Sequence, residues 1–169
     1  MENMEFRNAD TFSRAEIAMF KKILVHAGQV TEETFPALIA KNPRILFLDH
    51  TNKPTGIGAL KIPHKSYKDS VFSKAKSEKN PDDFKFELGW VVSLSKGNGN
   101  RITAILAEYA DIKTYATVRE DNVPMINLLK KYEFEQSGVP YPTTRNNQDY
   151  TLLLFIKSAR QDSGLPLTF

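Results

Sequence analysis

A carboxylate and a glycine-rich run stand close together in the middle of the chain. The carboxylate is Glu87, and the run is Lys96-Gly97-Asn98-Gly99-Asn100-Arg101. We predict a strand over residues 84 to 93, then a loop, then a helix over residues 101 to 112. A helix start after such a loop directs backbone N–H groups and the positive end of the helix dipole at one point. A phosphate group is the natural occupant of that point.

The predicted strand alternates between two faces. Residues 84, 86, 88, 90 and 92 are all apolar and should lie under helices. The other face carries Glu87 and then Gly89, where the missing side chain lets a ligand approach the backbone. Two plainer interpretations stay open: Glu87 as a solvated strand residue, and the glycines as a turn with positive φ. The run matches neither the Gly-Lys-Ser/Thr of a phosphate-binding loop nor Gly-x-Gly-x-x-Gly.

The surrounding elements form an α+β or mixed α/β pattern. Ser13 and Glu16 have capping-box spacing before a helix, and an antiparallel hairpin is expected around the turn at residues 52 to 56. Residues 138 to 148 are expected to be a loop. Further helices are predicted at 14–27, 31–41, within the Lys-rich segment 63–83, and at 122–131. Further strands are predicted at 45–48, 58–62, 114–118, 132–135 and 150–157.

Composition sets broad limits on the class of protein. The 169 residues suit a single domain, residues 1 to 169. No cysteine is present, which excludes disulfides and thiolate metal sites and fits a cytoplasmic protein. We expect no metal cofactor and no membrane segment, and the N-terminus is unlike a secretion signal. The net charge of +3 is a mild bias toward anionic ligands.

The glycine run after its strand resembles the cofactor signature of the GNAT acyltransferases, Arg/Gln-x-x-Gly-x-Gly/Ala. Lys96 stands at the basic position and Gly99 at the central glycine, while Arg101 replaces the final small residue. Residues 117 to 134 resemble the family's later motif, in which an asparagine opens a helix that ends in a Gly-Phe turn. Asn122 and Phe134 fit that motif. The resemblance implies a GNAT fold, with a central mixed sheet of six to seven strands and four or five flanking helices.

The resemblance also implies a reaction: transfer of an acetyl or other acyl group from acetyl-CoA to an amine. The pyrophosphate would lie on the N–H groups of residues 97 to 101, and the pantetheine arm beside Val91, Val92 and Ser93. The Val92 N–H would be a candidate donor to the thioester oxygen, and Glu87 the base that deprotonates the amine. The alternative is that no side-chain base is needed and bulk water takes the proton. The cofactor-binding set is Val91, Val92, Ser93, Lys96, Gly97, Asn98, Gly99, Asn100, Arg101 and Asn122. Asn122 has a second interpretation as a helix N-cap.

The sequence departs from the family at two positions in the later motif. Glu133 replaces the glycine of the turn, and Leu129 stands where many relatives have the tyrosine that protonates the leaving thiolate. Tyr132 lies nearby, but we interpret it as a core aromatic residue. Three alternatives then stay open: water protonates the leaving thiolate, another tyrosine protonates it, or the protein is a poor enzyme.

Residues outside the two motifs are weaker candidates. Tyr141 and Arg145 are predicted to line the acceptor site, from their place in the last long loop. The lysines of the Lys-rich segment suit a solvated helix face, a lid beside the acceptor cleft, or contact with the 3′-phosphate. These lysines are Lys65, Lys68, Lys74, Lys76 and Lys79. The three histidines are interpreted as bystanders: His26, His50 and His64.

Two other functions compete with the acetyltransferase. A GNAT-fold module that binds coenzyme A without effective catalysis fits Leu129 and Arg101. A nucleic-acid-binding or nucleic-acid-modifying protein fits the pI of 9.0, but the chain has no aromatic-basic platform. The sequence does not identify the acceptor amine, nor does it separate a monomer from a homodimer.

Overall fold

The structure, a computed structural model, describes residues 3–49, 53–145 and 147–158. His50 and the tail from residue 159 lie outside this part. The strands are β1 (Met4–Asn8), β2 (Arg44–Leu48), β3 (Gly56–Lys61), β4 (Phe86–Ser93), β5 (Thr114–Arg119), β6 (Phe134–Gln136), β7 (Tyr141–Arg145) and β8 (Gln148–Lys157). The α-helices are α1 (Arg14–His26), α2 (Phe35–Ile39), α3 (Lys65–Lys74), α4 (Asn98–Tyr109) and α5 (Val123–Lys131).

All strands belong to one mixed sheet in the order β1-β2-β3-β4-β5-β8-β6, with β7 also paired to β8. Every pairing is antiparallel except that of β4 with β5, and the predicted β2–β3 hairpin is present. The mixed α/β class is confirmed, and the described sheet has eight strands rather than six to seven. The additional strands are β1, for which nothing was predicted, and β7.

β7 occupies part of the segment that was predicted to be a loop. Pro142 argued against a strand because proline cannot donate to a ladder. β7, however, pairs on one side with β8, where Pro142 lies opposite Thr151. An edge strand tolerates a proline whose missing N–H would face away from the ladder. The prediction of an irregular loop was therefore wrong at residues 141 to 145.

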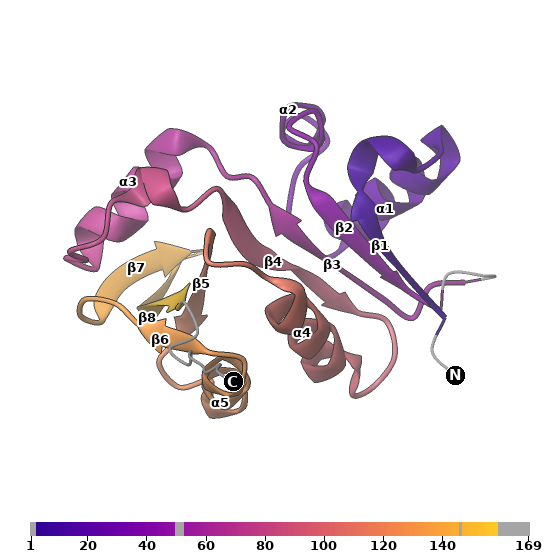
Figure 1. Cartoon of the computed structure of the whole chain (residues 1–169). Coiled ribbons are helices and arrows are strands. Elements are labelled where there is room, and N and C mark those ends of the chain that lie inside the picture. Colours follow the sequence, from indigo (N-terminus) through magenta and orange to yellow (C-terminus); the bar gives the residue numbers. More distant parts are fainter. Residues whose placement is uncertain (1–2, 50–52, 146, 159–169) are drawn as a thin grey trace, which may run out of the picture.

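Helices cover both faces of the sheet (Figure 1). On one face, α1 and α2 pack over β2 and β3 through a cluster that includes Phe20, Phe47 and Trp90. On the other face, α4 and α5 pack through a cluster that includes Leu106 and Leu129. A third cluster lies beneath α3. Among the described residues, no helix is long and apolar enough to cross a membrane.

α4 begins three residues before the predicted start, at Asn98 instead of Arg101. Asn98 holds the earlier start, because its side chain donates to the Thr55 carbonyl at 3.1 Å and its amide donates to the Ser95 carbonyl at 3.3 Å.

The body of α4 packs closely on β3. A Cβ added to Gly58 would lie 2.7 Å from Cγ2 of Ile102 and 2.8 Å from Cδ1 of Leu106, so the glycine lets the helix approach the strand. Burying Ile102 and Leu106 completely outweighs the cost of about 1 kcal/mol for a glycine inside the helix.

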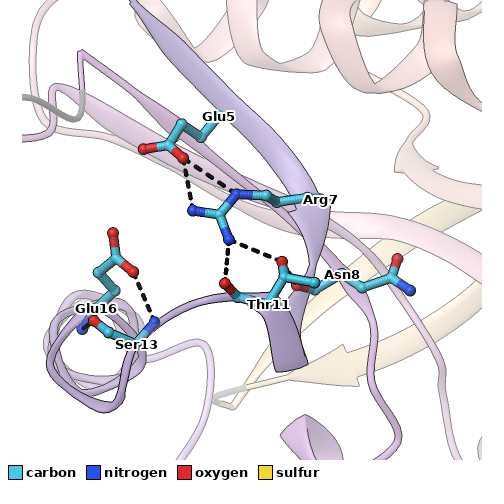
Figure 2. A network of polar contacts seen from close by, with 6 residues as sticks. All are labelled: Glu5, Arg7, Asn8, Thr11, Ser13 and Glu16. Atoms are coloured by element: carbon cyan, nitrogen blue, oxygen red, sulfur yellow. Dashed lines mark hydrogen bonds and ion pairs between the residues drawn. The ribbon is translucent and has the colours of Figure 1, made fainter.

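The start of α1 is fixed by the polar network in Figure 2. Ser13 Oγ accepts from the Glu16 amide at 3.1 Å, and Glu16 Oε1 accepts from the Ser13 amide at 2.7 Å, which confirms the predicted capping box. Arg7 on β1 bridges Glu5 and Thr11, with Nη2 2.7 Å from Glu5 Oε1. The network ties the end of β1 to the start of α1. The segment predicted as a helix at 31–41 contains only the short α2, with Pro36 in its first turn.

A β-bulge divides β4. The register with β3 shifts between Ile57 and Ala59, and Trp90 opposite has φ of +55°, which is unusual for a bulky residue. The bulge breaks the predicted alternation: Leu88 packs under α4, whereas Trp90 packs under α1 and α2. The single apolar face predicted for residues 84 to 92 is therefore wrong. The bulge brings Glu87 and Trp90 to the same side of the sheet.

Candidate active site

One edge of β4 is open beyond its first residues. β4 pairs with β5 only at Phe86 opposite Thr114 and Glu87 opposite Tyr115, and β5 then continues along β8. From Leu88 onward, the edge of β4 toward β5 has no strand partner among the described residues. Backbone N–H and C=O groups on such an edge are available to an extended ligand.

The ladder with β3 determines which amides face this edge. The Leu94 amide donates to the Thr55 carbonyl at 2.8 Å, and Val92 lies opposite Ile57. Hydrogen-bonded and non-bonded pairs alternate along an antiparallel ladder, so the Val92 amide also faces β3. Ser93 and Val91 then face the open edge. The Val92 N–H, which was predicted to serve the thioester oxygen, therefore points away from this edge, whereas the Val91 N–H faces it.

The start of α4 lies directly after this open strand. Gly97 is the N-cap with φ of +87°, and an added Cβ at Gly97 or Gly99 would meet nothing within 4 Å. Among the described residues no side chain caps α4, and the first-turn amides of Gly99 and Asn100 have no partner within a helix by position. The Asn98 amide is already engaged, since it donates to the Ser95 carbonyl at 3.3 Å.

The remaining predicted cofactor residues take different positions. Lys96 is exposed beside Gly97, whereas Asn98 Nδ2 donates to the Thr55 carbonyl at 3.1 Å and so braces the start of α4. Arg101, half-buried on α4, has Nη1 3.5 Å from Asn98 Oδ1. Asn122 Oδ1 accepts from the Met125 amide at 3.3 Å, which confirms its interpretation as the N-cap of α5.

A cavity of about 500 Å³ opens on the other side of β4, beneath the connection between α1 and α2. This volume is in the range of small-molecule sites. Polar and aromatic side chains come to it from β3, β4, β7, α3 and the residue before α3. They are Lys61, His64, Tyr67, Glu87, Trp90 and Arg145.

Glu87 is the buried carboxylate of this cavity, with 4% of its surface exposed. Its Oε1 lies 3.4 Å from Lys61 Nζ, directly across the β3–β4 ladder, and accepts no hydrogen bond from the described residues. Its Oε2 accepts from the Tyr67 hydroxyl at 3.3 Å. The lysine and the phenol offset the cost of burying the charge. Glu87 is therefore not the solvated strand residue of the plainer interpretation.

Three tyrosines surround Glu87. Burial, and then the negative charge of Glu87, raise the pKa of Tyr67 and of Tyr115 well above the usual range and raise the pKa of Tyr141 to about 12. The hydroxyls of Tyr115 and Tyr141 are buried with no hydrogen-bond partner among the described residues. All three phenols therefore stay protonated at neutral pH, and the Tyr67 hydroxyl is the one that donates to the carboxylate among the described residues.

Other predicted residues fall inside and outside this cavity. Tyr141 and Arg145 come to this region from β7. α3 contributes Tyr67 to the cavity and lies at the end of β4 opposite to the β4–α4 loop (Figure 1). His64, which was interpreted as a bystander, lines the cavity. Leu129 is completely buried in the core between α5 and the sheet.

Lysines of the Lys-rich segment are partly engaged within the protein. Lys65 forms ion pairs with Asp69 and Asp82, and Lys68 Nζ donates to the Phe84 carbonyl at 2.9 Å. Lys74, Lys76 and Lys79 are exposed.

Sequence reasoning missed three contributors to the cavity: Lys61, Tyr67 and Trp90. Lys61 gave a usable signal, because it lies at the end of a predicted strand that pairs with the strand of Glu87. Tyr67 gave no signal of its own, because it reaches Glu87 from a helix twenty residues earlier in the chain. Trp90 was assigned to the opposite face, since no sequence pattern marked the bulge.

Comparison with protein-family profiles finds no match, and comparison with curated protein sequences finds none either. Comparison with solved structures finds acetyltransferases. The chain is similar to the ribosomal-protein-S18-alanine N-acetyltransferase of Escherichia coli, with a TM-score of 0.56, 16% identity, and 100% of each chain covered.

Two further solved structures show the same arrangement. Arabidopsis thaliana NAA60 in complex with acetyl-CoA has a TM-score of 0.57 and 15% identity, over 91% of this chain and 98% of that one. An acyl-CoA N-acyltransferase of Pseudomonas aeruginosa has a TM-score of 0.57 and 11% identity, over 90% and 98%. The chain therefore has the GNAT acyltransferase fold.

Proposed function

We propose that the protein is an N-acetyltransferase that moves an acetyl group from acetyl-CoA to an amine by direct attack. The observation that carries the proposal is the position of β4 between two sites. One edge of the strand is open and leads to an uncapped helix start, and the adjoining face holds a buried carboxylate in a cavity. A thioester along the edge and an amine in the cavity would meet at the bulge.

The donor is assigned to the open edge and the start of α4. The pantetheine arm would pair with Val91 and Ser93, and the pyrophosphate would accept from the Gly99 and Asn100 amides. Lys96 adds a positive charge nearby, and the Asn122 side-chain amide remains a candidate contact to the arm. The open space at Gly97 and Gly99 supports this assignment, since a side chain there would fill the cradle.

Glu87 is assigned the role of general base. A protonated amine has no lone pair for attack, so a group near it must accept a proton, directly or through a water. Oε1 is the available oxygen of Glu87, because it accepts no hydrogen bond from the described residues. Tyr67 holds Oε2 and thereby orients the carboxylate.

Water is assigned the protonation of the leaving thiolate. Leu129 lies in the core and cannot donate. The pKa of each tyrosine near Glu87 is raised by burial and by that carboxylate. Proton transfer from such a phenol to a thiolate, whose conjugate acid has a pKa of about 8.5, would be uphill. Exchange with bulk solvent, which takes up the proton that Glu87 accepts and delivers one to the thiolate, is the remaining route.

Calorimetric titration with acetyl-CoA tests the donor site, using Gly99→Glu as the decisive variant. A carboxylate in the first turn favours the helix, and replacing glycine there adds up to about 1 kcal/mol of helix stability. The variant should therefore fold, yet lose acetyl-CoA affinity by about 100-fold or more through repulsion of the diphosphate. Gly99→Gln is the matched control for size.

Equal acetyl-CoA affinity in Gly99→Glu and the original chain would contradict the donor site. Affinity for acetyl-CoA without thiol release on any amine would instead favour the catalytically weak coenzyme A-binding module.

A further inference from the structure

The cavity around Glu87 carries an excess of positive charge. Lys61 forms an ion pair with Glu87, so these two charges offset one another. Arg145 then remains as a second cation on the cavity lining. Lys41 adds a further positive charge behind the lining, because its Nζ lies 3.1 Å from Nδ1 of the lining residue His64. An ammonium can only donate, so His64 accepts at Nδ1 and carries its proton on Nε2.

Strand pairing fixes the backbone of Arg145, whereas its side chain forms no hydrogen bond or ion pair with the described residues. Arg145 is the last residue of β7 and pairs with Gln148 at the start of β8, which makes it part of a hairpin. The guanidinium lies near the buried phenols, since its charge lowers the pKa of Tyr67 and Tyr141 against the raising effect of burial.

The other lining residues and the volume of the cavity limit the size and polarity of a ligand that lies between Glu87 and Arg145. Trp90, Val30 and Leu38 form an apolar wall that suits methylene groups. A volume of about 500 Å³ admits a small molecule. A planar guanidinium binds carboxylates in a two-point geometry, which a lysine ammonium does not match.

We propose that the acceptor is a small amine that carries a carboxylate on the same molecule. Its amino group lies at Glu87 and its carboxylate is bound by Arg145. The proposal rests on the proposed function for the transfer step alone. In that step a C–N bond forms to the acyl carbon and the C–S bond breaks, the amine proton passes to Glu87, and the thiolate takes a proton from water.

The test uses pairs of amines that differ only in the carboxylate. Each ω-amino acid from 3-aminopropanoate to 6-aminohexanoate is compared with the alkylamine of the same carbon number. Binding is measured by calorimetry, with and without saturating coenzyme A, and turnover by thiol release from acetyl-CoA. We expect the best amino acid to bind about 10- to 100-fold more tightly than its alkylamine, the range of a charge-assisted hydrogen-bond pair.

Variants assign the preference to Arg145. Arg145→Gln should remove the preference for the amino acid and leave alkylamine binding unchanged. Arg145→Lys should retain part of it, since the charge stays but the two-point geometry is lost. Arg14→Gln is the matched control: it changes an exposed arginine at the start of α1, whereas the cavity adjoins the other end of that helix.

The outcomes separate this inference from the proposed function. Preferential binding of amino acids that depends on Arg145 supports the inference even if no acetyl group is transferred. Equal binding of both members of every pair overturns it, and so does the absence of binding to any amino acid. An equal loss for amino acid and alkylamine in Arg145→Gln also overturns it. Failure of the proposed function appears separately, as absence of acetyl-CoA binding or of thiol release.

Discussion

The two sides of β4 offer different kinds of chemical group. The edge toward β5 and the start of α4 present backbone amides, among them those of Ser93 and Gly99. The face beneath α1 and α2 presents side chains, with Glu87 held by Lys61 and Tyr67. Any residue supplies an amide, so the first site tolerates extensive sequence change. The second depends on the residues of this chain.

This contrast agrees with the structural similarities. The fold matches acetyltransferases that are only 11 to 16% identical to the chain. The proposed donor site uses backbone groups, so it tolerates such sequence divergence wherever the strand opens and the helix begins in the same place. Under the proposed function, differences in specificity would then come from the side chains of the cavity.

The largest effect is expected from breaking the side-chain site alone. Glu87→Gln keeps the shape of the residue but removes the base, so kcat should fall by about 10²- to 10⁴-fold. Acetyl-CoA affinity should stay the same, since the donor site contains no part of Glu87. Thiol-release kinetics across the pH range and calorimetry measure the two. An unchanged rate at every pH would remove Glu87 from the mechanism.

The docking of α3 beside the cavity is the next target. Gly138 has φ of +77°, and an added Cβ would lie 2.0 Å from the Ala75 carbonyl oxygen, just beyond α3. Gly138→Ala should lower the free energy of unfolding by about 3 kcal/mol, through strain and displacement of α3.

Gly28→Ala is the matched control for Gly138→Ala. Gly28 has φ of +74° with nothing within 4 Å of an added Cβ, so only the backbone cost of about 1 kcal/mol applies. Urea unfolding measures both variants. Equal losses would show that the contact with Ala75 contributes nothing.

Alkaline pH should weaken the side-chain site. Burial and Glu87 raise the pKa of Tyr141 to about 12, above its unfolded value of about 10. The folded state therefore binds more protons in this window, and stability that is complete below pH 10 is lost as pH rises through 12. The loss should be about 1–2 kcal/mol once solvent screening is allowed for. Tyr141→Phe should make the pH dependence of urea unfolding shallower, and an identical profile would contradict the shift.

The smallest effect is expected at a turn that belongs to neither site. Glu133 has φ of +70°, the conformation that favours glycine, between α5 and β6. Glu133→Gly should raise the free energy of unfolding by about 1 kcal/mol by relieving that strain. Acetyl-CoA affinity and turnover should not change. A decrease in stability would show that the Glu133 side chain contributes more than its backbone conformation costs.

Much of the fold was predictable because its signals are local. The capping box of Ser13 and Glu16 and the apolar stripe of α4 each lie within a few residues. β7 was missed because its proline is tolerated only at a sheet edge, which the local sequence does not reveal. The shift of the α4 start was missed because Asn98 is held by the Thr55 carbonyl, more than forty residues earlier.

The candidate site was predictable where one motif contains it, and not where strands meet. Glu87 and the glycine run were singled out from the chain alone, and the structure places them on β4 and at the start of α4. Lys61 and Tyr67 reach Glu87 from other elements, so their role needed the register of β3 and the position of α3. The bulge at Trp90 was invisible because a left-handed tryptophan has no sequence signature.

Trp90 has a practical consequence of its own. It is the only tryptophan among the 169 residues, it lines the cavity, and its ring lies 5.6 Å from Lys61 Nζ. The intrinsic fluorescence of the protein above the tyrosine emission therefore comes from one indole that lines the proposed acceptor site. Unlabelled acceptors are expected to change the intensity or wavelength of the Trp90 emission as they bind, so that binding can be measured without an added fluorophore.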